Sequence, residues 1–173
     1  DHKRPDEETV RPSMDEAVVY VVDDDASVRR ALSRLIHSVG LEVMTFPSAH
    51  AFLAFAAPVR PACLVLDVRL PGPSGLDLQA ALTQANRSVP IVFITGHGNV
   101  PTSVRAMKGG AVDFLQKPFN DQELLDCVQR ALRGSGEERA EKAEGKELER
   151  RVGALTPRER EVLMLVVAGM LNK

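Results

Sequence analysis

Each of four apolar runs in this chain is followed by side chains that could do chemistry. In chain order these side chains are Asp23, Asp24 and Asp25, then Asp67, Thr95 and Lys117. Carboxylates that meet at one place raise each other's pKa unless a cation offsets their charge. Hard oxygen ligands in small number suit Mg²⁺, which keeps several of its waters. The set therefore predicts phosphoryl transfer with a divalent metal, provided that the fold brings these side chains together.

The residue types in this set indicate distinct roles. A carboxylate can act as a nucleophile and form an acyl phosphate, while a lysine and a metal ion neutralise charge on the transferring oxygens. Asp67 is the best nucleophile candidate because it follows the third of five predicted strands, beside the first. Each residue also has an ordinary interpretation, since aspartates cap helices and form turns, and Lys117-Pro118 can belong to a plain loop.

Apolar periodicity predicts the elements that must position these residues. Short continuous apolar runs predict buried strands, and apolar residues at helical spacing follow each of them. The predicted strands cover residues 17–22, 41–46, 63–66, 89–94 and 111–115. Helical crossovers require parallel pairing, so the expected fold is α/β, a doubly wound five-stranded parallel sheet of order 2-1-3-4-5. Ligands bind such sheets beyond the carboxyl ends of the strands, which is where the acids stand.

Four segments resemble the receiver domain of two-component response regulators, and the resemblance spans residues 17–134. They are Val22-Asp-Asp-Asp25, Leu66-Asp-Val-Arg-Leu-Pro-Gly72, Ile94-Thr-Gly-His-Gly98 and Phe114-Leu-Gln-Lys-Pro-Phe119. Their order and separations match that family, and the segment from Thr95 to Pro101 is similar to the FixJ type. Two positions depart from the FixJ pattern, because Asn99 and Gln116 stand where Asp and Glu are usual.

The resemblance implies a role for each matching residue. Asp67 is the implied phosphoryl acceptor. Asp24 and Asp67 would bind Mg²⁺, or another divalent cation such as Mn²⁺ or Ca²⁺, together with the backbone carbonyl of Arg69. Asp23 would act through water, and Lys117 would pair with the phosphoryl group. The protein would then be a phospho-accepting switch rather than an enzyme.

The resemblance also implies which residues would change conformation on phosphorylation and which partners would respond. Thr95 and Phe114 would form the switch pair, although Phe114 could equally be an ordinary core aromatic residue. The Lys117–Pro118 bond is expected to be cis. The implied partners are a sensor histidine kinase as phosphoryl donor and a second copy of the chain, which would dimerise on phosphorylation.

Composition and charge argue against several other classes of protein. The formal net charge is −2, so there is no chain-wide basic footprint for nucleic acid. The two cysteines form no C-x-x-C pair, and no apolar run approaches a membrane span. Residues 1–16 are polar with charges of both signs, which predicts a disordered leader and no secretory signal. We therefore expect a cytoplasmic protein with no membrane partner.

The C-terminal part divides into two expected segments. Gly134-Ser-Gly136 is expected to break or kink the fifth helix, and residues 135–154 to form a charged helical linker, either solvated or paired in a dimer. Residues 155–173 resemble the opening of a LuxR-type helix-turn-helix, with Thr156, Pro157 and Glu159 as a helix start. The sequence stops where the second helix would begin. A longer parent protein would bind promoter DNA, and this chain would not.

Two other classes of protein share parts of this pattern. Aspartate-nucleophile phosphatases also place Asp after an apolar strand, but they need a second acid where Arg69 stands. Flavodoxin-type modules need a Ser/Thr/Gly loop to cradle phosphate, and Asp23–Asp25 would repel it. A receiver that signals without phosphorylation is a third alternative.

Overall fold

A parallel five-stranded sheet lies at the centre of the structure, a computed structural model that describes residues 16–171. Most of the expected leader, residues 1–15, lies outside the described residues. The strands are β1 (Val18–Val22), β2 (Glu42–Phe46), β3 (Ala62–Asp67), β4 (Ile91–Thr95) and β5 (Asp113–Gln116). Their order is β2-β1-β3-β4-β5 and every neighbouring pair is parallel. The predicted fold class is confirmed.

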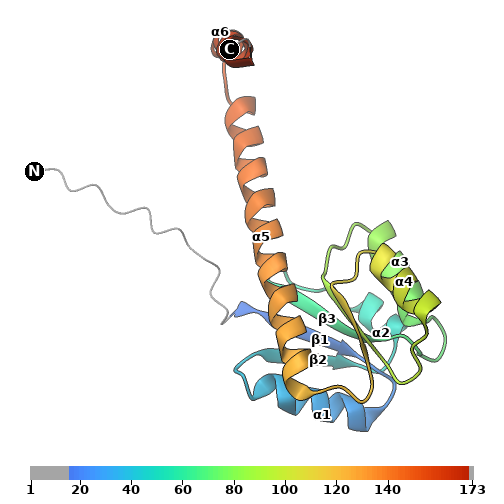
Figure 1. The fold of residues 1–173 in the computed structure, drawn as a ribbon. Helices are drawn as coiled ribbons and strands as arrows, with labels where there is room; N and C mark the ends of the chain where they lie inside the picture. Colours follow the sequence, from blue (N-terminus) through green and yellow to red (C-terminus); the bar gives the residue numbers. More distant parts are fainter. Residues whose placement is uncertain (1–15, 172–173) are drawn as a thin grey trace, which may run out of the picture. The chain divides into compact units, whose positions relative to one another are not determined.

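Helices cover both faces of the sheet (Figure 1). They are α1 (Ala26–His37), α2 (Ala49–Ala54), α3 (Gly75–Gln84), α4 (Val100–Lys108), α5 (Asp121–Gly153) and α6 (Pro157–Leu171). One apolar core joins α1 and α5 to the sheet, and a second joins α2, α3 and α4 to the opposite face. Alternate residues of β1 enter the two cores, Val19 and Val21 on one side and Tyr20 on the other. Burial on both faces explains the continuous apolar runs in the sequence.

The register of the strands brings their carboxyl ends to one edge. Val22 pairs with Leu66, so the residues after β1 lie beside the end of β3. On the other side, Asp67 pairs with Ile94, the residue before Thr95. Residues that are far apart in the sequence therefore meet at this edge of the sheet.

Side-chain caps define where several helices begin. The Asp25 carboxylate accepts hydrogen bonds from the amides of Ser27 and Val28 and starts α1 directly after the acidic segment. Asn99 caps α4 in the same way, through the amide of Thr102. Capping boxes start two further helices, formed by Ser74 with Asp77 at α3 and by Thr156 with Glu159 at α6. The helix start predicted at Thr156 is confirmed.

The only tyrosine of the chain lies in an aromatic cluster on the face covered by α2 and α3. The ring centroid of Tyr20 is 6.2 Å from that of Phe46, 5.4 Å from that of Phe52 and 5.9 Å from that of Phe55. The Tyr20 side chain is 1% exposed. Aromatic pairs at these distances pack favourably, so the cluster holds β1, β2 and α2 together.

The expected break at Gly134-Ser-Gly136 is wrong, because α5 runs through this segment to Gly153. Ser135 is buried, and its hydroxyl accepts a hydrogen bond from the Ala62 amide at the start of β3. Ion pairs between successive turns support the later part of the helix, as between Lys142 and Glu138. These contacts offset the cost of about 1 kcal/mol that each glycine imposes on a helix.

Gly134→Ala is expected to stabilise the protein. A Cβ atom built at Gly134 meets no heavy atom within 4 Å, so the methyl group has room. Alanine favours the helix over glycine by about 0.8–1.0 kcal/mol, and the free energy of unfolding should rise by a similar amount. Urea unfolding followed by circular dichroism measures the change. A less stable variant would contradict a continuous helix at this position.

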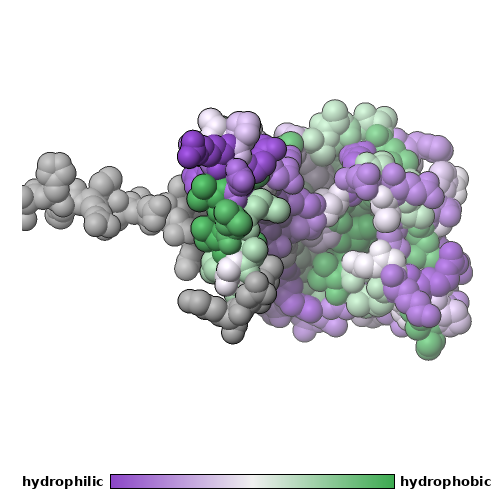
Figure 2. Space-filling view, turned by 90° about the horizontal axis from the view of Figure 1, so that it is seen from above, coloured by the Kyte–Doolittle hydropathy of each residue, from purple (hydrophilic) through white to green (hydrophobic). Residues whose placement is uncertain are grey.

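The chain divides into two compact units, Asp1–Gly136 and Glu137–Lys173. In the second unit, α6 exposes a set of large apolar side chains. They are Val162, Leu163, Met164, Leu165, Val166, Val167 and Met170. Figure 2 shows hydrophobic groups in green beside hydrophilic groups in purple on the face seen from above. Of the helices described between residues 16 and 171, none combines the length and the hydropathy needed to span a membrane.

Candidate functional site

Three aspartates from two neighbouring strands meet at the carboxyl edge of the sheet. Asp23 and Asp24 follow β1, and Asp67 is the last residue of β3. One carboxylate oxygen from each lies within 4.8 Å of the others. Asp23 is fully buried, Asp67 is 7% exposed, and Asp24 is exposed to solvent. The structure thus brings together three of the four carboxylates that the sequence singled out, while the fourth, Asp25, caps α1.

Lys117 places a cation against these carboxylates. Its Nζ atom lies 3.1 Å from Oδ2 of Asp23 and 3.5 Å from Oδ2 of Asp67. The residue follows β5, and its backbone amide donates a 2.7 Å hydrogen bond to the carbonyl of Thr95 on β4. The Lys117–Pro118 bond is cis, as expected.

Backbone amides and one arginine hold the acidic residues in place. The Asp25 amide donates to Oδ1 of Asp23 at 2.9 Å, and the Arg69 amide donates to Oδ1 of Asp67 at 3.0 Å. Arg29 on α1 donates from Nη1 to the carbonyl oxygen of Asp23 at 2.7 Å. Sequence reasoning missed Arg29, because its contact joins a helix to the loop before it. The carbonyl of Arg69 as a metal ligand stays a prediction.

Gly75 allows α3 to approach the end of β3 closely, and sequence reasoning missed this too. A Cβ atom at this position would lie 2.3 Å from the backbone oxygen of Asp67. The Gly75 amide donates to the carbonyl of Val68 at 2.9 Å. The glycine therefore fixes the backbone that carries the Asp67 carboxylate.

Electrostatic contacts shift the pKa values of two of these groups. Burial raises the pKa of Asp67 above its ordinary 3.8, and the Asp23 carboxylate adds to the rise, although the Arg69 amide and Lys117 oppose it. Burial alone would lower the pKa of Lys117, but the Asp67 and Asp23 carboxylates outweigh it, so the pKa lies above its ordinary 10.5. Without a further cation, this site therefore disfavours ionisation of the Asp67 carboxyl group.

Asp67→Asn is expected to make the metal-free protein more stable at pH 7. The folded state binds the Asp67 proton more tightly than the unfolded state. The contribution of Asp67 to the free energy of unfolding therefore falls as the pH rises from about 3.8 through its raised folded pKa. Asparagine has no such proton, so the difference in free energy of unfolding between Asp67→Asn and the unmodified chain should disappear below pH 3.8. Urea unfolding with a chelator at several pH values tests this, and a less stable variant at pH 7 would contradict it.

Thr95 and Phe114 lie together beside this pocket. Thr95 ends β4, is 1% exposed, and accepts a 3.2 Å hydrogen bond on its hydroxyl from the His97 amide. Phe114 on β5 is half-buried. A Cβ atom at Gly98 would lie 3.1 Å from both the Phe114 ring and the Thr95 methyl group, so the loop after β4 covers the pair closely.

The donor set fits a hard divalent cation. Three carboxylates converge on one place, one of them solvent-exposed and open to water. The nearby lysine balances only part of their charge. Carboxylate and water oxygens are the ligands that Mg²⁺ prefers. The arrangement can therefore hold a small cation beside a carboxylate that could act as a nucleophile.

Comparisons with known proteins identify one family for this chain. Residues 19–129 match the family described as the response regulator receiver domain. Nodulation protein W of Bradyrhizobium diazoefficiens is 53% identical over 157 residues, which cover 91% of this chain and 69% of that protein. Response regulator protein TodT of Pseudomonas putida is 43% identical over 172 residues, which cover 99% of this chain and 76% of that protein.

A further relative and a solved structure are also similar to this chain. Transcriptional regulatory protein FixJ of Rhizobium meliloti is 41% identical over 160 residues, covering 92% of this chain and 78% of FixJ. The solved structure of response regulator StyR matches with a TM-score of 0.83 and 47% identity, covering 89% of this chain and 78% of StyR. These names describe regulators rather than enzymes, so they do not support the phosphatase alternative.

Proposed function

Because the chain belongs to the two-component response regulators with a receiver domain, we propose that it accepts a phosphoryl group on Asp67 from a sensor histidine kinase. One observation carries the proposal. Asp67 lies with Asp23, Asp24 and Lys117 in a single cluster, although these residues stand at the ends of three different strands. We place the exchange in the cytoplasm, which suits the free thiols of Cys63 and Cys127.

In the proposed reaction the Asp67 carboxylate attacks the phosphorus of a phosphohistidine. A new O–P bond forms, the P–N bond of the donor breaks, and the imidazole nitrogen keeps the electron pair and takes up a proton. The Arg69 amide orients the attacking carboxylate through Oδ1, and the Lys117 ammonium next to Oδ2 offsets charge on the phosphoryl oxygens. The pocket then stores the group as an acyl phosphate.

A divalent cation completes the charge balance of this site. We propose that Asp24 and Asp67 hold Mg²⁺, Mn²⁺ or Ca²⁺ with the Arg69 carbonyl, while Asp23 contributes through water. When bound, the metal neutralises negative charge on the carboxylates and the phosphoryl oxygens. Asp23 already accepts from Lys117 and from the Asp25 amide, so this buried carboxylate is fixed by the protein itself.

We propose that Thr95 and Phe114 transmit the change to the surface. The Thr95 hydroxyl would exchange its bond with the His97 amide for one with a phosphoryl oxygen, and Phe114 would turn inward. This would alter the surface formed by α4, β5 and α5 and favour a homodimer. Sedimentation with beryllofluoride and Mg²⁺ should show a dimer, and a monomer at high concentration would reject this step.

The output we propose is transcriptional control through DNA. Residues from 155 onward resemble a LuxR-type helix-turn-helix, and the exposed apolar side chains of α6 are those that its first helix would bury. We propose that the second helix of such a motif reads the DNA bases, as recognition helices do.

Incubation with acetyl phosphate and Mg²⁺ tests the central proposal. Intact mass should show a single added phosphoryl group, because one carboxylate in the pocket is proposed as acceptor. The same incubation with a chelator should leave the mass unchanged, since the carboxylates then repel the incoming anion. An unchanged mass in folded, metal-loaded protein would overturn the proposal.

A further inference from the structure

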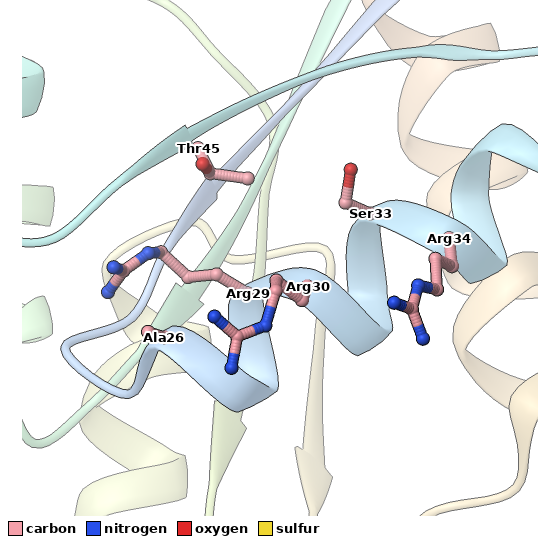
Figure 3. Close-up of a pocket in the computed structure, with 6 residues that line it drawn as sticks. All are labelled: Ala26, Arg29, Arg30, Ser33, Arg34 and Thr45. Atoms are coloured by element: carbon pink, nitrogen blue, oxygen red, sulfur yellow. The ribbon is translucent and has the colours of Figure 1, made fainter.

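Arg29 is joined to the acidic cluster through the backbone rather than through a carboxylate. Its Nη1 atom donates a 2.7 Å hydrogen bond to the carbonyl oxygen of Asp23. Figure 3 shows the Arg29 side chain extending from α1 toward the loop that joins β1 to this helix. The carbonyl belongs to the peptide unit between Asp23 and Asp24, and peptide units are planar. Arg29 therefore fixes the orientation of the backbone from which the Asp24 side chain projects.

Asp24 depends on this backbone contact more than the other two acids of the cluster do. The Asp23 carboxylate accepts hydrogen bonds from a backbone amide and from Lys117, and the Asp67 carboxylate accepts one from a backbone amide. In the part of the chain that the structure describes, no group donates a hydrogen bond to the Asp24 carboxylate, which is exposed to solvent. Its position relative to the other two carboxylates is therefore set by the local backbone.

The helix dipole does not account for the position of Arg29. This residue is the fourth of α1, and a cation near the N-terminal end of a helix is unfavourable. Arg34, by contrast, lies in the last turn, where the dipole favours a cation. Within residues 16–171, Arg29 forms no ion pair that would offset this effect. The half-buried Arg29 side chain is instead held by its bond to the Asp23 carbonyl.

We propose that Arg29 is a positioning residue that gives the acidic site its preference for Mg²⁺ over Ca²⁺. The inference rests on the metal site proposed above, in which Asp24 is a ligand. Mg²⁺ demands near-ideal octahedral geometry at about 2.0–2.1 Å, whereas Ca²⁺ accepts flexible geometry at about 2.3–2.6 Å. A fixed Asp24 backbone favours the smaller ion, and a loose backbone removes that advantage. Groups that orient a ligand without touching the metal affect metal affinity strongly.

The charge of Arg29 alone would have the opposite effect. A guanidinium group beside the cluster repels any cation that binds there, so its removal should strengthen the binding of every divalent ion. Loss of positioning should instead weaken Mg²⁺ binding and change Ca²⁺ binding little. The ratio of the two affinities separates these roles, because a change of charge affects both divalent ions alike.

NMR titration of the Arg29→Gln chain with Mg²⁺, and separately with Ca²⁺, tests the inference. Amide shifts in the loop between β1 and α1 report binding of either ion. Mg²⁺ binding should weaken by roughly tenfold, and Ca²⁺ binding by no more than about twofold. Arg29→Lys keeps the charge but replaces the planar guanidinium with a flexible ammonium, so the Mg²⁺/Ca²⁺ affinity ratio should fall by roughly threefold. This variant decides the question if Arg29→Gln does not fold.

Arg30→Gln is the matched control, because it removes the same charge from the next residue. Arg30 is exposed and donates to the Ser27 hydroxyl at 3.4 Å rather than to the Asp23 carbonyl. Its affinity ratio should equal that of the unmodified chain. An unchanged ratio in the folded Arg29 variants, or an equal fall in Arg30→Gln, would overturn the inference.

The titration contains no phosphoryl donor, so a failed transfer reaction cannot be mistaken for a failed positioning role. An unmodified chain that binds neither ion would overturn the proposed metal site, and this inference with it. An unmodified chain that binds Ca²⁺ more tightly than Mg²⁺ would overturn the inference alone.

Discussion

Asp67→Asn is expected to abolish the uptake of a phosphoryl group from acetyl phosphate, whereas Asp25→Asn should keep it. Asp67 is the carboxylate that lies next to the Lys117 ammonium, at 3.5 Å, and is oriented by the Arg69 amide. An amide in its place is a poor nucleophile and cannot form the acyl phosphate. Intact mass after incubation with acetyl phosphate and Mg²⁺ measures the loss.

Asp25→Asn is a matched control for that variant. It removes the same charge from the same edge of the sheet, and Asp25 is exposed. Asparagine also caps helices well, so the hydrogen bond from the Ser27 amide, 2.7 Å long, can be retained and α1 should still begin there. Equal phosphoryl uptake by Asp67→Asn and the unmodified chain would show that another residue is the acceptor.

Gly75→Ala is expected to destabilise the protein by about 3 kcal/mol, the upper part of the usual range for overpacking. The new Cβ would lie 2.3 Å from the Asp67 carbonyl oxygen and 3.0 Å from Cα of Val68. Both atoms belong to the backbone and cannot rotate away, so the end of β3 or the start of α3 must move. The melting temperature should fall by roughly 10 °C. Thermal unfolding monitored by circular dichroism measures this change.

Gly134→Ala is the control for this effect, because the same substitution there meets open space and should stabilise the chain. Gly75→Ala should also slow phosphoryl uptake at temperatures where it is folded, since the displaced backbone carries the Asp67 carboxylate. A Gly75→Ala protein as stable as the unmodified chain would show that the two segments can separate at little cost.

The sheet and the acidic pocket were predictable because both follow from local patterns. Continuous apolar runs marked the strands, and the residues after them had to meet once the strands were parallel. This logic placed Asp24, Asp67 and Lys117 together without any knowledge of distances. The comparisons and the fold bear out the family, while the roles of single residues stay proposals.

Contacts between distant segments were not predictable. The close approach at Gly75 and the bond from Arg29 to the Asp23 carbonyl depend on how a helix lies against a loop, which no local pattern records. The continuity of α5 through Gly134 likewise depends on the burial of Ser135 and its bond with Ala62. Local propensity indicated a break there, and tertiary contact overrode it.

Tyr20 is a built-in spectroscopic probe, because it is the single tyrosine of the chain. The chain has no tryptophan and no other tyrosine, so tyrosine emission arises from a single buried ring three residues before Asp23. Burial raises the pKa of this phenol, and ionised tyrosine absorbs differently from the neutral form. An alkaline spectrophotometric titration would therefore register when this face of the sheet opens, without any attached dye.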